Sequence, residues 1–287
     1  MPTLRIAADA SLIGVAVIWG ATFPLAKVVL RSLGPFSYLG LRFAIAGVLL
    51  LPLARRDLKR LRLADLGRGW LTGAVLFAAY ALQTLGLAQT TASKAGLITG
   101  LNVVIVPVLL FVWIRRVPSA PTAAGVALAA CGLWLLSWQG ERLSAGDALV
   151  LGCAVALALH LILVGRFAGA LPPAGFAFLQ VSTVAVLGGA VGLVWEPRPI
   201  GVLPGTIASV VFMAVGATFA AYLAQSWAQR TVSPTRTGLL FAVEPVAAVG
   251  FSVAWLGEAL GTRQALGAAA ILAGVALGEA GRARDGA

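Results

Sequence analysis

Long uninterrupted runs of apolar residues most constrain what this chain can fold into. A helix needs about 20 apolar residues to cross the hydrocarbon core of a bilayer. The runs are continuous rather than alternating, which argues against the strands of a membrane β-barrel. The sequence therefore predicts an all-α integral membrane protein with ten transmembrane helices, at 9–31, 37–54, 66–88, 94–114, 121–138, 147–167, 174–194, 205–228, 234–256 and 264–281.

The composition leaves little room for any soluble domain. Hydrophobic residues make up 60% of the chain and charged residues only 11%, whereas soluble domains are about 25% charged. Ten spans of about 20 residues leave loops of only about eight residues each. A soluble catalytic or nucleotide-binding domain does not fit there, and the three lysines do not follow a phosphate-binding glycine loop.

The positive charges fall mainly on one side of the predicted helices. If the ends and loops are numbered alternately from inside, fourteen of the 21 Lys and Arg residues are inside and five outside. The other two, Lys27 and Arg42, lie within spans. This bias predicts a multi-pass protein of the inner or plasma membrane with both termini in the cytoplasm. The basic run at 55–68 is interpreted as a topology determinant, and no nucleic-acid partner is expected.

An internal repeat divides the chain into two halves, 1–140 and 141–287. Three short patterns occur in the same order in both halves: the seven-residue pattern FAAYxxQ, the tripeptide Thr-Gly-Leu, and a proline inside the fourth span of each half. They lie at 77–83 and 219–225, at 99–101 and 237–239, and at Pro107 and Pro245. Each half holds five spans, so the second half enters the membrane from the opposite side. Two inverted five-helix repeats are a transporter architecture, with the site between the halves near the midplane.

Several short motifs resemble those of the drug/metabolite transporter superfamily, specifically its EamA family. They are Trp19-Gly20-Ala21-Thr22-Phe23-Pro24, Arg42-Phe43, Glu244-Pro245 and Gly257-Glu258. The resemblance covers essentially the whole chain and implies efflux. Characterised relatives export amino acids or other small metabolites, and one branch exports aromatic amino acids. The first half departs from the pattern, because Val106-Pro107 stands where the second half has Glu244-Pro245. The two halves are therefore chemically unequal.

Polar and aromatic side chains near the midplane are the candidates for substrate binding. Tyr80 and Gln83 lie on one helix face, as do Tyr222 and Gln225, because each pair is three residues apart. From their helix directions, the two tyrosines are predicted on opposite sides of the bilayer centre. A hydroxyl and an amide from each half would bind one polar ligand, or else hold neighbouring helices together. Trp19, also central, would stack on an aromatic or apolar ligand.

Glu244 is the acidic residue predicted closest to the bilayer centre. A carboxylate at this depth costs roughly 2.5–3.5 kcal/mol on insertion scales, so it must face protein or water. It would bind a substrate amine or carry a coupling proton, or it would bond to helix ends freed by Pro245. Asn102 and His160 lie at similar depth. For His160 a satisfied packing role and a proton relay both stay open.

Charged residues nearer the span ends have simpler interpretations. Lys27 and Arg42 are expected to extend toward the outer interface, or to contact a substrate carboxylate in an outward-open cavity. Asp9 and Asp147 are expected at helix starts, where they cap the helix and complement its dipole. No transport role is assigned to these two acids.

No metal or cofactor is expected, since His160 is the only histidine and the two cysteines fall inside spans. The favoured function is a secondary transporter that exports small metabolites, amino acids above all, aromatic and hydrophobic ones included. Another organic solute or drug is the alternative substrate. A membrane-embedded enzyme acting on lipid-linked substrates is disfavoured, because no paired acids or nucleophile-base motif is present. The expected partners are the bilayer and the small-molecule substrate, without an ATPase subunit.

Overall fold

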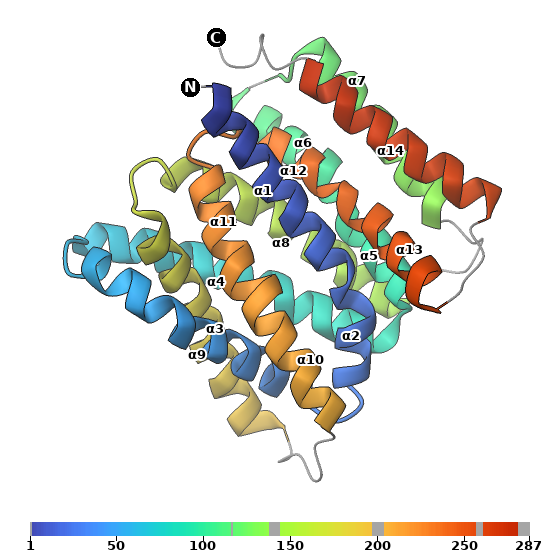
Figure 1. Cartoon of the computed structure of the whole chain (residues 1–287). Helices are drawn as coiled ribbons and strands as arrows, with labels where there is room; N and C mark the ends of the chain where they lie inside the picture. The colour runs from blue at the N-terminus through green and yellow to red at the C-terminus, as the bar shows by residue number, and fades with distance from the viewer. Residues whose placement is uncertain (1, 116, 138–143, 197–203, 257–260, 281–287) are drawn as a thin grey trace.

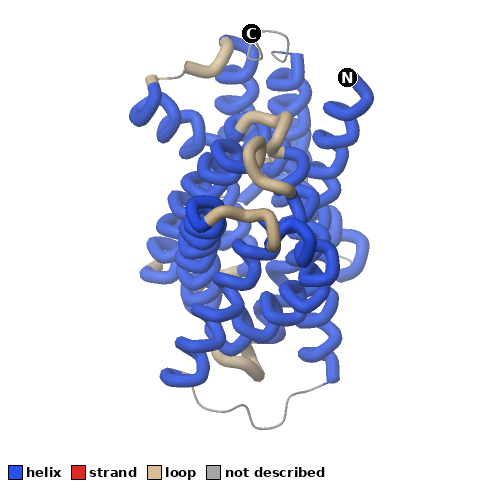
Figure 2. The backbone as a smooth tube through the Cα atoms, turned by 90° about the vertical axis from the view of Figure 1, so that its left-hand side faces the viewer, coloured by secondary structure: helices blue, strands red, loops and turns tan. Residues whose placement is uncertain are grey.

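The computed structural model describes residues 2–115, 117–137, 144–196, 204–256 and 261–280, and within these ranges it contains helices and no strand (Figure 2). Several predictions lie outside the described residues: the Gly257-Glu258 motif, the last residues of the spans ending at 138 and 281, and the charges of Arg116, Arg142, Arg198, Arg282 and Arg284.

The described helices line up as ten rods, which agrees with the predicted fold. Four rods are formed by more than one helical segment. In chain order the helices are α1 Pro2–Gly20, α2 Thr22–Val29, α3 Pro35–Leu58, α4 Leu63–Gln89, α5 Ala92–Gly100, α6 Asn102–Ile114, α7 Ala120–Ser137, α8 Ala145–Phe167, α9 Pro173–Trp195, α10 Pro204–Ala214, the π-helix Val215–Ala220, α11 Ala221–Ala228, α12 Pro234–Phe241, α13 Val243–Leu256 and α14 Thr262–Ala280. Seven rods among the described residues are long and apolar enough to cross a membrane.

Two of the interruptions lie just before a proline. The α1–α2 rod breaks at Ala21, three residues before Pro24, and the α12–α13 rod breaks at Ala242, three residues before Pro245. Proline lacks an amide hydrogen and cannot bond the carbonyl four residues earlier. The missing bond accounts for these two interruptions, whereas Pro107 lies inside the uninterrupted helix α6.

Equivalent rods of the two halves pack against each other. The α3 helix lies along α9 and α7 lies along α14, and the packing of α4 on α8 is matched by that of α11 on α1 (Figure 1). Glycines permit the closest approach: a Cβ at Gly125 would lie 2.5 Å from the Gly274 carbonyl oxygen, and one at Gly132 would lie 2.6 Å from that of Gly267. Glycines of α7 therefore meet glycines of α14 across the two halves.

Carboxylates at opposite ends of the α3–α9 pair tie the two helices together. Glu196 accepts hydrogen bonds from the backbone amides of Phe36 and Ser37, both at 2.8 Å, at the start of α3. Asp57, near the end of α3, accepts one from the amide of Gly175 at 3.2 Å, at the start of α9. Each acid thereby satisfies amides that a helix start leaves without partners.

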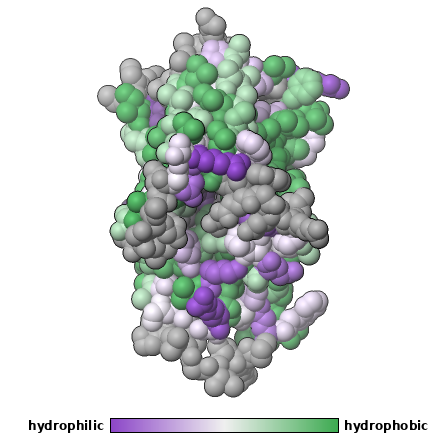
Figure 3. All heavy atoms as spheres, turned by 90° about the vertical axis from the view of Figure 1, so that its right-hand side faces the viewer, coloured by the Kyte–Doolittle hydropathy of each residue, from purple (hydrophilic) through white to green (hydrophobic). Residues whose placement is uncertain are grey.

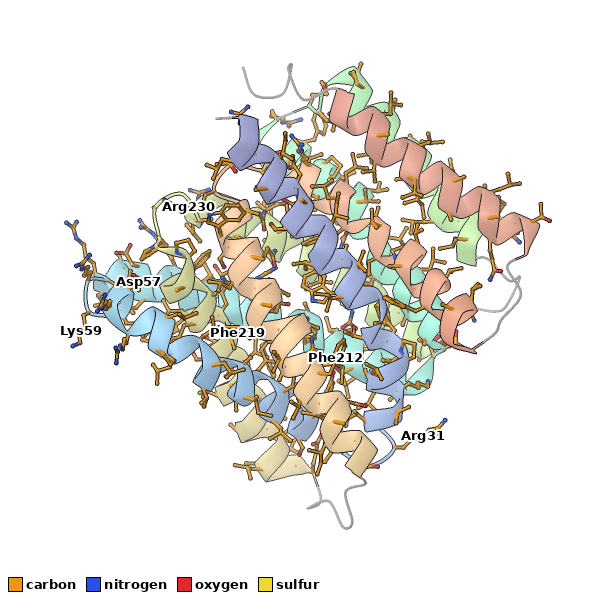
Figure 4. All side chains as sticks on the ribbon, in the orientation of Figure 1. Arg31, Asp57, Lys59, Phe212, Phe219 and Arg230 are labelled. Carbon is orange, nitrogen blue, oxygen red and sulfur yellow. The ribbon has the colours of Figure 1, made fainter. Side chains whose placement is uncertain are left out.

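The surface is that of a protein surrounded by lipid. Large apolar side chains such as Val48, Leu193 and Trp195 are mostly exposed, and hydrophobic residues cover broad areas of the face seen in Figure 3. Lys59 and Arg230 lie toward one end of the rods and Arg31 toward the other (Figure 4). This arrangement agrees with the side on which the sequence places each of these three residues.

Candidate substrate site

A cavity lies where the interrupted rods meet α4 and α8. The empty space between its side chains is about 550 Å³, open side included. All eight residues predicted for the substrate site line it: Trp19, Tyr80, Gln83, Asn102, His160, Tyr222, Gln225 and Glu244. The structure therefore brings the predicted residues of both halves of the chain together around one cavity. A substrate-binding role for these residues stays a prediction.

The breaks in the rods shape the cavity wall. Trp19 and Thr22 flank the break at Ala21, and Phe241 and Glu244 flank the break at Ala242. The two breaks lie against each other, because a Cβ at Gly20 would be only 2.7 Å from the Glu244 carbonyl oxygen. The Trp-Gly-Ala and Glu-Pro motifs thus form one contact between the first and ninth rods.

The two repeated tyrosines meet directly. The Tyr222 hydroxyl donates to the Tyr80 hydroxyl at 2.9 Å, and their positions on opposite sides of the bilayer centre stay a prediction. Residues from different rods surround them: the Trp19 and Tyr222 ring centroids are 6.0 Å apart, and those of Phe43 and Tyr80 are 5.0 Å apart. These separations are typical of favourable aromatic pairs, and they give the cavity an aromatic wall.

The acceptor groups of the wall are only partly used. Glu244 is half-buried, and its carboxylate has no hydrogen bond or ion pair within the described ranges. The expected bond from this carboxylate to free helix ends is therefore not found there. The amide oxygens of Asn102 and Gln225 are buried and lack partners among the described residues. Buried polar atoms are normally paired, so this wall has unused capacity to bind a ligand.

Two other wall residues have partners within the protein. His160 shares a 2.7 Å hydrogen bond with the Gln180 side-chain oxygen, and Gln83 donates to the Thr99 hydroxyl at 3.4 Å. The packing interpretation of His160 is therefore supported by a partner, although the ring also lines the cavity.

Arg42 does not extend to the outer interface, and that expectation is wrong. Only 3% of the surface of Arg42 is exposed. The guanidinium donates to the Thr218 hydroxyl at 2.7 Å, the Tyr38 hydroxyl at 2.9 Å and the Ala217 carbonyl at 3.1 Å. The π-helix makes this possible, because its altered bonding frees carbonyls inside the rod. Arg42 does not line the cavity, but its Cζ atom is 5.3 Å from the centre of the Tyr80 ring, which does.

Lys27 and Asp9 both have partners within the protein. The Lys27 ammonium donates to the carbonyls of Leu87 and Thr90 at the end of α4, and its extension toward the outer interface stays a prediction. Asp9 is not at a helix start, since α1 begins at Pro2; it accepts a 2.6 Å bond from Arg236 of the other half. Asp147 does cap its helix, because its carboxylate accepts from the Ser144 amide at 2.8 Å.

Sequence reasoning missed several wall residues. The cavity is also lined by residues that the sequence did not suggest as substrate contacts, among them Phe23, Thr99, Cys153, Leu157 and Phe241. Thr99 belongs to the repeated Thr-Gly-Leu pattern and Phe23 to the WGATFP motif, so those signals were available. Leu157 and Cys153 carry no sequence mark that separates them from other apolar residues of α8.

The fold and its internal cavity define a multi-pass membrane protein made of two similar halves around one site. The chain belongs to the EamA-like transporter family, whose model matches residues 6–138 and again residues 144–278.

Two relatives and one solved structure are similar to this chain over most of its length. It is 33% identical over 272 residues to an uncharacterized transporter of Archaeoglobus fulgidus, covering 94% of this chain and 85% of that protein. It is 26% identical over 282 residues to the uncharacterized transporter YyaM of Bacillus subtilis, covering 92% and 90%. A crystal structure superposes with a TM-score of 0.77 at 22% identity, covering 95% and 96%, and shows the same fold. The protein is a membrane transporter.

Proposed function

We propose that this protein is a secondary transporter that exports small metabolites, with amino acids as its principal substrates, by alternating access around the central cavity. The single observation that carries the substrate class is a pair of opposite charges near this cavity, neither of which has an ionic partner in the described residues. Glu244 is on the wall, and Arg42 is in contact with Tyr80 behind it.

A free amino acid complements these two charges. A charge that is partly removed from water is unfavourable without a partner, and an ammonium against the half-buried Glu244 would supply one. The carboxylate would bind at the Tyr80 and Tyr222 hydroxyls, in the electrostatic field of Arg42. Trp19 and Phe241, with ring centroids 4.9 Å apart, would contact an apolar or aromatic side chain.

The remaining parts of the proposal come from the sequence. The charge bias supports an inner or plasma membrane location with cytoplasmic termini, and the family resemblance supports export. The proposed partners are the substrate and the bilayer, with no nucleic acid and no ATPase subunit. Another organic solute or drug is the second candidate, supported by the aromatic share of the wall.

Flux into proteoliposomes tests the proposal. Phenylalanine, its amide and phenethylamine are compared, together with an aliphatic amino acid, a charged amino acid and a sugar. We expect amino acids to move above the empty-liposome background, and the Gln83→Ala and Tyr222→Ala proteins to move them more slowly. Gln89→Ala is the matched control, because Gln89 is exposed and bonds only within α4. The proposal fails if no amino acid moves, or if the site variants behave like this control.

A further inference from the structure

Two ionic contacts in equivalent positions join the halves near opposite ends of the rods. In the first, Asp9 of α1 bonds Arg236 at the start of α12, at 2.6 Å. In the second, Asp147 at the start of α8 lies 3.8 Å from the Lys94 ammonium at the start of α5, and it also accepts a bond from the Thr90 hydroxyl. We call these contacts the Asp9 lock and the Asp147 lock.

The locks are equivalent under the internal repeat. Asp9 and Asp147 each precede an alanine in the first rod of a half, and Lys94 and Arg236 each lie in the first helical turn of the fourth rod. The helices α5 and α12 begin alike, with Thr91 and Ser233 accepting a bond from the backbone amides of Lys94 and Arg236. In both locks the acid belongs to one half and the cation to the other.

The cavity lies between the two locks. Trp19 follows Asp9 by ten residues along α1, a rise of about 15 Å. Cys153 follows Asp147 by six residues along α8, a rise of about 9 Å. Because α1 and α8 run in opposite directions, the locks lie beyond opposite ends of the cavity. The acids themselves are buried, with Asp9 7% and Asp147 3% exposed.

Hydrogen bonds beside each lock strengthen the same closure. Near the Asp9 lock, the Gln229 amide donates to the Leu161 carbonyl at 2.9 Å, which joins α8 to the segment before α12. Near the Asp147 lock, Lys27 at the end of α2 donates to the Leu87 and Thr90 carbonyls at the end of α4. Separation of the rods at either end must break the lock at that end, while the other lock is unaffected.

We infer that Asp9–Arg236 and Asp147–Thr90–Lys94 are the two gates of the transport cycle, each holding one end of the cavity shut while the other opens. This inference rests on the proposed alternating access but not on the identity of the substrate. The four charged residues are positioning residues that set the balance between the two open states. A ligand or variant shifts such a balance only by its differential effect on the two states.

The native cysteines allow a direct test without any substrate. Cys153 lines the cavity and is fully buried, so its reaction with a membrane-impermeant thiol reagent reports opening of the cavity. The other cysteine is removed by Cys131→Ser. Labelling rates are measured in right-side-out and inside-out vesicles. We expect Arg236→Gln to raise the rate at least about threefold from one side only, and Lys94→Gln from the other side only.

Matched controls separate gating from loss of surface charge. Arg230 and Arg31 are exposed, lie near opposite ends (Figure 4), and make no ionic contact within the part of the chain that the structure describes, so Arg230→Gln and Arg31→Gln should leave labelling unchanged. The exchange Asp9→Arg with Arg236→Asp should restore the slow rate, which a misfolded protein cannot do. Equal labelling from both sides, or no increase over the controls, overturns the inference. If one-sided labelling is observed but no amino acid is transported, the proposed function alone fails.

Discussion

The two halves of the molecule share their fold but differ in where the core is charged. Arg42 and Gln180 each lie seven residues after the proline that begins their helix, α3 or α9, and both are buried. Val106 and Glu244 each precede the proline of their fourth rod. One position of each pair is charged and its counterpart is neutral. The inverted repeat thus supplies a nearly symmetric framework, whereas the charged residues give the site one positive and one negative side.

Replacing the negative side should have the largest effect. We expect Glu244→Gln to lower amino-acid flux by at least about 30-fold, since truncating one member of a buried charge pair costs roughly 2–5 kcal/mol. If Glu244 also carries the coupling proton, the remaining flux should no longer respond to a pH gradient. Proteoliposome flux at several gradients measures both effects. Asp65→Asn, at an exposed ion pair with Arg68, is the control. An unchanged gradient response would remove Glu244 from proton coupling.

The Arg42→Gln substitution removes the positive charge and gives α3 the same residue as its counterpart in α9, Gln180. Arg42→Gln should lower flux of the amino acid about tenfold while affecting its amide less, because a carboxylate at the Tyr80 and Tyr222 hydroxyls would lose the Coulombic attraction of the guanidinium behind them, whereas the uncharged amide would not. Arg42→Lys should be intermediate, since an ammonium lacks the planar fork that reaches three acceptors. Arg68→Gln serves as control. An equal loss for the acid and the amide would show that Arg42 acts on folding rather than on the substrate.

The contact between the two broken rods can be tested by stability. The Gly20→Ala substitution places a methyl group within 2.9 Å of Ala247 and Ala248. Such overpacking costs about 1–3 kcal/mol, so thermal unfolding in detergent should shift downward. Gly250→Ala, in the same α13 rod, has nothing within 4 Å of the new atom and should not destabilise. Similar behaviour of the two variants would contradict the close approach of α1 and α13.

The tyrosine pair should give the smallest effect. Tyr222→Phe removes the hydroxyl that donates to Tyr80, and a net contribution of about 1 kcal/mol predicts roughly a fivefold change in apparent affinity. Tyr80→Phe removes the acceptor of the same bond, so its effect should be of similar size. Competition assays with the transported amino acid measure both. Unchanged affinity in both variants would contradict a role of the two hydroxyls in binding the substrate carboxylate.

Sequence patterns predicted the rods well and the side-chain contacts poorly. The spacing of apolar residues locates the spans because every helix in lipid must satisfy its own backbone. Pro24 and Pro245 marked two of the breaks. Yet FAAYxxQ folds as regular helix in α4, whereas in the second half its first two residues belong to the π-helix Val215–Ala220. The difference is that Arg42 bonds Thr218 and Ala217 there, a contact between residues far apart in the chain.

The sequence by itself determined the helical membrane fold, the inverted duplication and eight of the residues that line the cavity, because hydrophobic length and repeat order can be followed along the chain without knowing its contacts. Only the tertiary structure decided that Tyr80 meets Tyr222, that Arg42 is buried, and that Asp9 pairs with Arg236. Each of these contacts joins one half to the other. Their geometry depends on how closely glycine-lined helices approach and on which carbonyls the helix breaks leave free.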